Sequence, residues 1–270
     1  MITKNIRTLA IILMMTLLVS PKLWSRENPG SNSPGLQYSP KLLEDNPERT
    51  LLNIGNWGYW MRDNGESAHT PGGNSGGIYP RSTAAAIYLD GILVGGYQNN
   101  LLKVSGQIYT TGTVQGYIQN GQIMTEGARI YRIRKDWETL TLAQVRQDAA
   151  DFYEKALGSV SDADAQSMID QYEKDWNEWP TGIGAPFYDL DSDGVYEPAD
   201  GETPGVANAD QIIWYVINDN DPTTTADLYG TDPIGLEMQM TLWGYNQPGA
   251  SLGQIVFKQI RLINKGGGDL

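Results

Sequence analysis

The chain of 270 residues contains no cysteine. This absence excludes disulfide bonds, zinc sites built from thiolates and cysteine nucleophiles. Phenylalanine is also scarce, with 3 residues against 8 tryptophans and 15 tyrosines. Such an aromatic set favours half-buried, amphipathic packing positions, and less specifically it suits platforms that stack against sugars.

Basic residues are also few. The 19 Lys and Arg residues are outnumbered by 32 Asp and Glu residues, and the formal net charge is −13. An acidic surface repels phosphate groups, so we expect no binding to nucleic acid. The same surface suits divalent cations and a salty exterior.

A long apolar run occurs only near the start, at residues 9–19, where it follows Lys4 and Arg7. A basic stretch and an apolar run of this length are typical of a signal peptide. The run is too short to span a membrane comfortably. We therefore predict a signal peptide over residues 1–25, a secreted or cell-surface location, and no membrane span after cleavage. An uncleaved anchor is the alternative. Residues 26–40 are rich in Pro, Gly, Ser and Asn, and we predict a flexible lead-in over residues 26–50.

The most specific motif is the acidic stretch at residues 189–200. Its acidic residues occupy positions 1, 3, 5, 9 and 12, and Gly194 occupies position 6, as in a twelve-residue calcium loop. Gly194 permits the sharp turn because it has no Cβ, and alternating aspartates aim three carboxylates at one point. The predicted Ca²⁺ ligands are Asp189, Asp191, Asp193, the carbonyl of Val195, Glu197 and Asp200.

The loop departs from the usual pattern at its end. Asp200 stands where a longer Glu is usual, which predicts weaker binding. Pro198 and the pair Pro204-Gly205 argue against a long helix leaving the loop. The sequence therefore predicts a stand-alone, EF-hand-like loop. Its bound ion would hold in place the crossover between the helical segment and the next strand, because no disulfide is available to do so. The alternative is an acidic, solvated turn without an ion.

The remaining pattern is mainly that of β-strands. Apolar residues on both sides of Asp90-Gly91 and of Asn120-Gly121 predict two β-hairpins. Further strands are predicted at residues 102–111, 128–134, 211–217, 236–245 and 255–264.

The period becomes helical between residues 141 and 179. Thr141 with Gln144, and Ser161 with Asp164, are capping pairs that start two helices, and Gly158 is the expected end of the first. Short spacing implies an antiparallel helical hairpin. We predict a mainly β fold over residues 51–270: a β-sandwich-like body with this hairpin inserted and the stand-alone calcium loop after it.

Two further motifs are ambiguous. Residues 73–77 fit the G-x-S-x-G pattern around Ser75, and the sole histidine, His69, is nearby. That nucleophile elbow needs a following helix, but Ile78-Tyr79-Pro80 follows, so a glycine loop between strands is expected. The run at residues 218–221 allows a second metal site, although an Asx-rich turn is favoured.

Five segments carry a resemblance to one family. They are YEKDWNEWP at 172–180, DLDSDGVYEPAD at 189–200, DQIIWYV at 210–216, GLEMQM at 235–240 and IRLINK at 260–265. Together they resemble the large exported surface proteins of bacteria that use the type IX secretion system. The likeness covers most of residues 50–265 and implies export, with calcium binding at the six positions named above. Members of this family typically end in a β-rich sorting domain, and the chain lacks it, so we expect it to be the front part of a longer protein.

Three functions are compatible with these features. The favoured one is an exported, non-catalytic, calcium-stabilised surface or adhesion module whose partners are other surface proteins or glycans. The second is a glycan-binding or glycan-hydrolysing protein, which would need an exposed, coplanar pair of Trp57 and Trp60 beside free acids. A serine hydrolase built on Ser75 is a distant third.

Overall fold

The computed structural model describes residues 49–107 and 110–268. Residues from Pro47 to Leu270 form one compact unit. The predicted signal peptide and nearly all of the predicted lead-in lie outside the described residues. The first strand begins at Arg49, slightly before the predicted start of the domain. No helix within the described part is both long and apolar enough to cross a membrane.

Strands dominate the chain. They are β1 (Arg49–Leu52), β2 (Gly58–Arg62), β3 (Gly77–Ile78), β4 (Ala85–Ile87), β5 (Leu93–Gln98), β6 (Leu101–Gly106), β7 (Val114–Gln115), β8 (Tyr117–Gln119), β9 (Gln122–Met124), β10 (Tyr131–Arg134), β11 (Phe187–Tyr188), β12 (Thr203–Pro204), β13 (Gln211–Asn218), β14 (Leu236–Gly244) and β15 (Phe257–Asn264). The helices are α2 (Leu142–Phe152), α3 (Asp162–Asn177) and α4 (Pro222–Tyr229), and the short 3₁₀ helices are η1 (Trp137–Thr139), η2 (Leu157–Ser159), η3 (Thr181–Ile183), η4 (Pro198–Asp200) and η5 (Ser251–Gln254).

The main sheet has the order β10-β13-β14-β15, and β7 also pairs with β13. Its strands are antiparallel, and all eight residues of β13 are buried. The continuous apolar run at residues 212–217 explains this central place, because a strand covered on both faces needs apolar side chains on both.

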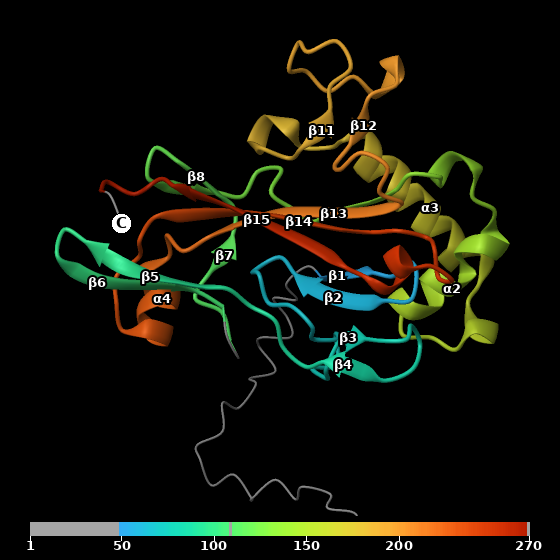
Figure 1. Cartoon of the computed structure of the whole chain (residues 1–270), viewed down its shortest axis with the longest axis horizontal. Coiled ribbons are helices and arrows are strands. Elements are labelled where there is room, and N and C mark those ends of the chain that lie inside the picture. Colours follow the sequence, from blue (N-terminus) through green and yellow to red (C-terminus); the bar gives the residue numbers. More distant parts are fainter. Residues whose placement is uncertain (1–48, 108–109, 269–270) are drawn as a thin grey trace, which may run out of the picture. The chain divides into compact units, whose positions relative to one another are not determined.

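A second sheet, in the order β1-β2-β3-β4, covers one face of the main sheet (Figure 1). Ile213, Tyr215 and Ile217 point toward it and join a core that also contains Leu52 and Met61. Two sheets packed over one core make the predicted β-sandwich-like body, and the mainly β fold is confirmed.

The other face of the main sheet is covered by the helical hairpin and the segments that follow it. Trp214 of β13 packs there with Tyr131 and Trp179. Helices α2 and α3 pack against each other through a small core of their own that includes Met168 and Tyr172. The inserted helical hairpin is therefore present where the sequence predicts it.

The two predicted β-hairpins have different outcomes. The one at Asn120-Gly121 is confirmed, since β8 and β9 pair and both turn residues have positive φ angles. The one at Asp90-Gly91 is wrong, because β4 pairs with β3 and β5 pairs with β6. A Cβ on Gly91 would lie 2.4 Å from the carbonyl oxygen of Gln107. Glycine is therefore required at this position because two backbone segments approach closely, and not because the chain turns.

The helix starts are confirmed, but one helix end is not. Both capping boxes form, at Thr141 and at Ser161. Helix α2 ends at Phe152, well before Gly158, because Glu154 adopts the left-handed conformation at φ 50° that a glycine usually supplies. The short helix α4 was not predicted.

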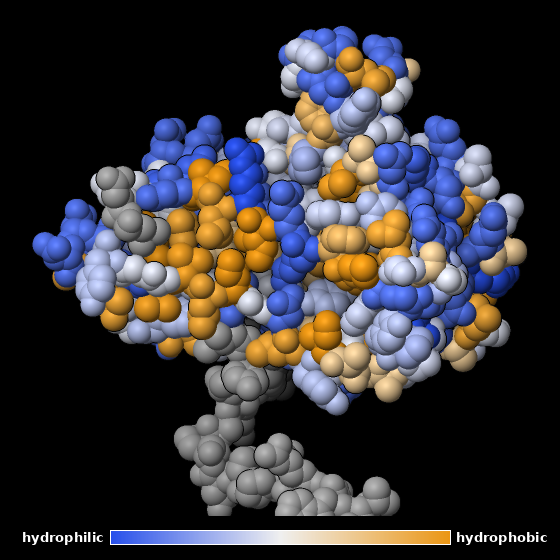
Figure 2. Space-filling view, viewed as in Figure 1, coloured by the Kyte–Doolittle hydropathy of each residue, from blue (hydrophilic) through white to orange (hydrophobic). Residues whose placement is uncertain are grey.

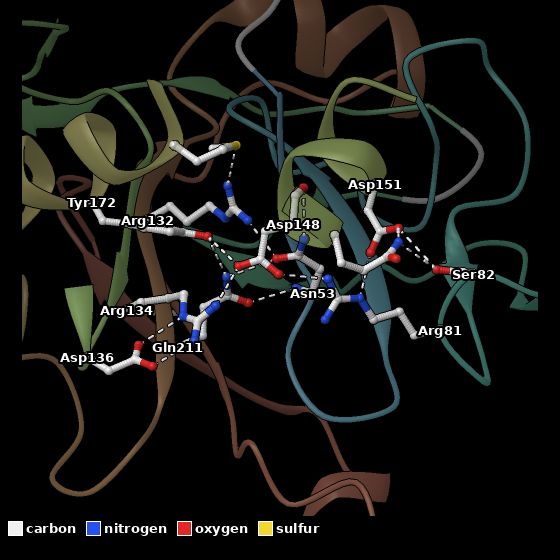
Figure 3. A network of polar contacts seen from close by, with 12 residues as sticks. Asn53, Arg81, Ser82, Arg132, Arg134, Asp136, Asp148, Asp151, Tyr172 and Gln211 are labelled. Carbon is white, nitrogen blue, oxygen red and sulfur yellow. Dashed lines mark hydrogen bonds and ion pairs between the residues drawn. The ribbon is translucent and has the colours of Figure 1, made fainter. Parts of the chain in front are cut away.

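Buried ion pairs tie the helical hairpin to the sheets (Figure 3). The carboxylate of Asp148 on α2 accepts hydrogen bonds from Arg81 and Arg134, each at 2.7 Å, and from the hydroxyl of Tyr172 at 3.2 Å. On β10, the strand that also carries Arg134, Arg132 donates to Asn53 at 2.6 Å. These contacts join α2 and α3 to β10 and to the loop after β1. They explain how β10 can bury two arginines.

We predict that Asp148→Ala lowers the free energy of unfolding by about 3–5 kcal/mol, because it leaves buried guanidinium groups without their partner. Urea unfolding followed by circular dichroism measures the change. The matched control is Asp162→Ala, whose carboxylate pairs with Arg146 but is 71% exposed. That variant should lose about 0–1 kcal/mol. Equal losses in the two variants would contradict the structural role given to Asp148.

Candidate metal centre

The acidic loop stands on a short two-stranded arm. Strands β11 and β12 pair through Phe187 with Pro204 and through Tyr188 with Thr203. The arm projects from the main sheet on the side away from the β1–β4 sheet (Figure 1). Its base is held by Tyr196, whose hydroxyl donates to the carbonyl of Trp176 on α3 at 2.9 Å. The loop is therefore exposed at its tip and anchored at its base.

The aspartates shape the loop through their own backbone. Asp189 accepts from the backbone N–H groups of Ser192 at 2.6 Å and Gly194 at 3.0 Å. Asp193 accepts in turn from the N–H of Val195 at 2.7 Å. These are Asx turns, which short acidic side chains favour. Gly194 has a φ angle of 79°, as the predicted sharp turn requires.

Two groups of carboxylates converge in this loop. One consists of Asp189, Asp191 and Glu202, and the other of Asp191, Asp193 and Glu197. In each group the nearest carboxylate oxygens lie within 4.8 Å of one another. Because carboxylate oxygens at such separations can share one cation, both groups could hold a metal ion.

The predicted ligands are distributed over both groups. Asp189 and Asp191 belong to the first group, and Asp191, Asp193 and Glu197 belong to the second, so their role as ligands of one ion stays a prediction. Asp200 belongs to neither group and lies in the 3₁₀ helix η4. The predicted role of the Val195 carbonyl stays a prediction.

Glu202 takes part in the first group, and the sequence analysis missed it. Its side chain is almost completely buried. One carboxylate oxygen accepts from the N–H of Leu190 at 2.9 Å, and the other accepts from the N–H of Glu197 at 2.8 Å. Glu202 thus holds two parts of the loop together through hydrogen bonds. One of its carboxylate oxygens also lies close enough to those of Asp189 and Asp191 to share a cation with them. A signal was present in the sequence, since Glu202 is the next acid after Asp200, but it falls two residues beyond the twelve-residue pattern.

The carboxylates of the loop repel one another. The pKa of Glu197 is raised above its usual value by the negative charge of Asp193, followed by those of Asp200 and Asp191. Since like charges disfavour ionisation, a bound cation would relieve this repulsion. The electrostatics of the loop therefore favour a cation.

The acidic residues that follow β13 accept hydrogen bonds from backbone N–H groups. Both carboxylate oxygens of the buried Asp219 accept backbone N–H groups of the segment at residues 234–236. Asp221 caps α4 by accepting from the N–H of Thr223 at 2.9 Å. Neither residue belongs to the acidic groups found in the described part of the chain. The turn interpretation of this run is therefore favoured over a second metal site.

The features on which the other two functions depend have structural roles. Trp60 is buried and stacks on Phe152, whereas Trp57 is half-buried and donates to the carbonyl of Gln254 at 2.8 Å. The two tryptophans therefore form no exposed pair. Ser75 is followed by β3 and not by a helix, so the geometry of a nucleophile elbow is not formed.

Comparison of the chain with protein-family models, with curated proteins and with solved structures gave no match. The resemblance to exported surface proteins therefore stays a prediction from the sequence.

We predict that Glu202→Gln weakens the binding of Ca²⁺ at least about tenfold, because it removes an oriented, charged oxygen that also holds the loop closed. Asp200→Asn removes one charge from the same loop but should have a smaller effect. Calorimetric titration of both variants and the parent protein measures the difference. A larger loss for Asp200→Asn would restore Asp200 as the closing ligand.

Proposed function

We propose that the protein is an exported, non-catalytic surface or adhesion module whose projecting arm is held in shape by a bound calcium ion. The observation that carries the proposal is that Asp189, Asp191, Asp193 and Glu197 contribute to two overlapping groups of carboxylates in one loop, which Glu202 fastens from inside.

Calcium is favoured by the chemistry of the donors. The loop offers carboxylate and carbonyl oxygens, the hard ligands that calcium takes in sets of about 6–8. Residues 189–202 contain neither histidine nor cysteine, which zinc prefers. Magnesium requires near-ideal octahedral geometry, and an exposed loop whose carboxylates fall into two overlapping groups supplies this poorly. An exterior rich in calcium suits a site of modest affinity.

A structural role for the ion follows from where the loop stands. The arm packs on α3 through Tyr196 and contributes Phe187 to the core beneath it. Loss of the cation would leave several like charges close together on a segment that no disulfide holds. The ion would therefore stabilise the arm rather than activate a substrate.

Export and a surface location rest on the sequence alone. Lys4, Arg7 and the apolar run at residues 9–19 support a signal peptide. The five family-like segments support membership of the type IX secreted surface proteins. A non-catalytic role is supported by the engagement of the buried Asp148 in ion pairs with Arg81 and Arg134.

The test is a calcium titration by calorimetry, with thermal unfolding followed in parallel. We expect one ion to bind with a Kd of about 10⁻⁴–10⁻³ M or lower. At ten times that Kd, binding should add about 1.4 kcal/mol to the free energy of unfolding. For a folded part of this size, the Tm should then rise by about 3–6 °C.

Asp189→Ala with Asp193→Ala should abolish both effects. The matched control is Asp170→Ala with Glu173→Ala, which removes two exposed acids of α3 and the same charge. It should bind calcium as the parent does. If the folded parent protein neither binds calcium nor gains stability, the loop is only an acidic turn. If the control loses binding as fully as the loop variant, general charge and not the site explains the effect.

A further inference from the structure

A hollow of about 380 Å³ lies between the β11–β12 arm and the main sheet. Ile133 of β10, Ile212 of β13 and Trp176 of α3 line it from the body of the protein. Tyr188 and Thr203 line it from the arm. Its size falls within the range of about 300–1,000 Å³ that is usual for small-molecule sites. The arm therefore bounds a space large enough for one small ligand.

The hollow is at the end of the main sheet where β13 begins. Ile212 is the second residue of β13, and it lies opposite Trp243 near the end of β14. Strand β15 ends instead beside Leu236, at the other end of β14. The residues that follow β15 therefore leave the sheet at the end away from the hollow.

Aromatic and apolar surface is exposed in this space. Tyr188 is 52% exposed, Leu190 is 54% exposed, and Trp176 is only partly buried against the core. Figure 2 shows apolar residues among the hydrophilic ones on the arm. Other contacts hold the arm in place, since Tyr196 packs edge-on against Phe187 and donates to the carbonyl of Trp176. The exposed side chains are therefore available to a ligand.

The polar side chains that line the hollow are also available. The ammonium group of Lys135, the hydroxyl of Thr203 and the side-chain amide of Asn208 form no hydrogen bond or ion pair within residues 49–107 and 110–268. In the same part of the chain, the indole N–H of Trp176 and the hydroxyl of Tyr188 form none either. A ligand with hydrogen-bonding groups on several sides could engage them without breaking a contact of the protein.

The charge of the lining is opposite to that of the chain. Lys135 is the one charged residue among those that line the hollow, and no acidic residue is among them. The whole chain has a net charge of −13. An unpaired ammonium group beside neutral donors suits a ligand that carries one carboxylate. A wholly apolar ligand would cover these polar groups without pairing them, which is unfavourable.

We infer that the hollow is a binding site for an acidic sugar, a hexuronic acid residue of a polysaccharide. The sugar carboxylate would pair with Lys135, and the sugar hydroxyls would bond to Thr203 and Asn208. The C–H face of the sugar ring would lie on Trp176 or Tyr188, whose side chains combine an apolar body with a polar group. These aromatic residues are other than the predicted pair of tryptophans in β2 and the loop before it.

This site would give the proposed surface module its ligand, and it rests on the proposed function only in its dependence on calcium. Leu190, which lines the hollow, stands between Asp189 and Asp191 of the acidic loop. Without an ion, the negative charge of the loop repels a carboxylate in the hollow, and bound calcium cancels part of this charge. Calcium should therefore tighten binding of the acidic sugar about threefold or more. By reciprocity, the sugar should tighten calcium binding by the same factor.

The probe is methyl β-glucuronide. Its control is methyl β-glucoside, which has the same ring but a neutral hydroxymethyl group in place of the carboxylate. Both are titrated into the protein by nuclear magnetic resonance, once with calcium and once with a chelator. We expect saturable binding of the glucuronide, with shift changes at the indole N–H of Trp176 and the side-chain amide of Asn208. The glucoside should bind about fivefold more weakly and depend little on calcium.

Variants test the charge and the aromatic surface separately. Lys135→Gln should weaken glucuronide binding about fivefold and leave glucoside binding unchanged. Its matched control is Lys174→Gln, which removes an exposed lysine of α3 that does not line the hollow. Tyr188→Ala should weaken the binding of both sugars. Its matched control is Tyr97→Ala on β5, where the side chain is 68% exposed. Both control variants should bind as the parent does.

Three results would overturn the inference. The first is no saturable binding of the glucuronide to the folded protein, which is also expected if a segment of the chain itself fills the hollow. The second is equal affinity for the two sugars. The third is an equal loss in Lys135→Gln and Lys174→Gln, which would mean attraction by general charge.

Calorimetry of calcium binding without sugar separates this inference from the proposed function. If calcium binds and the glucuronide does not, the hollow is no sugar site and the proposed function stands. If the glucuronide binds in the chelator and calcium does not bind at all, the proposed function fails and the sugar site stands. Equal glucuronide affinities with calcium and with chelator, in a protein that binds calcium, would overturn the coupling between the two sites.

Discussion

The structure depends on the complete burial of β13. Residues 212–217 of this strand carry apolar side chains on both faces, so both faces must be covered. The β1–β4 sheet covers the face of Ile213 and Tyr215, and the segments around Trp179 and Tyr131 cover the face of Trp214. The helical hairpin and the β11–β12 arm are therefore parts of the second cover and not independent additions. The shape and anchoring of the arm matter to the core for this reason.

Covering β13 with helices brings charge into the interior, because β10 carries two arginines beside it. Arg132 and Arg134 are buried, and each needs a partner that does not come from the sheet. The hairpin supplies Asp148 for Arg134, and the loop after β1 supplies Asn53 for Arg132. Since an unpaired buried charge is very unfavourable, these partners fix where α2 and α3 dock. The network orients the hairpin, whereas the apolar contacts of α2 and α3 hold it together.

Local signals predicted the parts of the fold that local interactions determine. Thr141 and Ser161 satisfy the first turns of their own helices, and Asn120-Gly121 adopts the positive φ angles of its own turn. The hairpin predicted at Asp90-Gly91 is wrong because Gly91 is needed for a close approach to the backbone of Gln107, a residue distant in sequence. Glu202 was missed for a related reason. A pattern based on spacing ends at Asp200, but the 3₁₀ helix η4 shortens the path, and Glu202 folds back under the loop.

The arm owes its proposed role to electrostatic repulsion within the acidic loop. Acidic side chains are held near one another there, and the negative charges of Asp193, Asp200 and Asp191 raise the pKa of Glu197. A cation is the species that lowers this energy, because it neutralises charges that the Asx turns and Glu202 keep close together. The arm is thus suited to an ion that holds its shape.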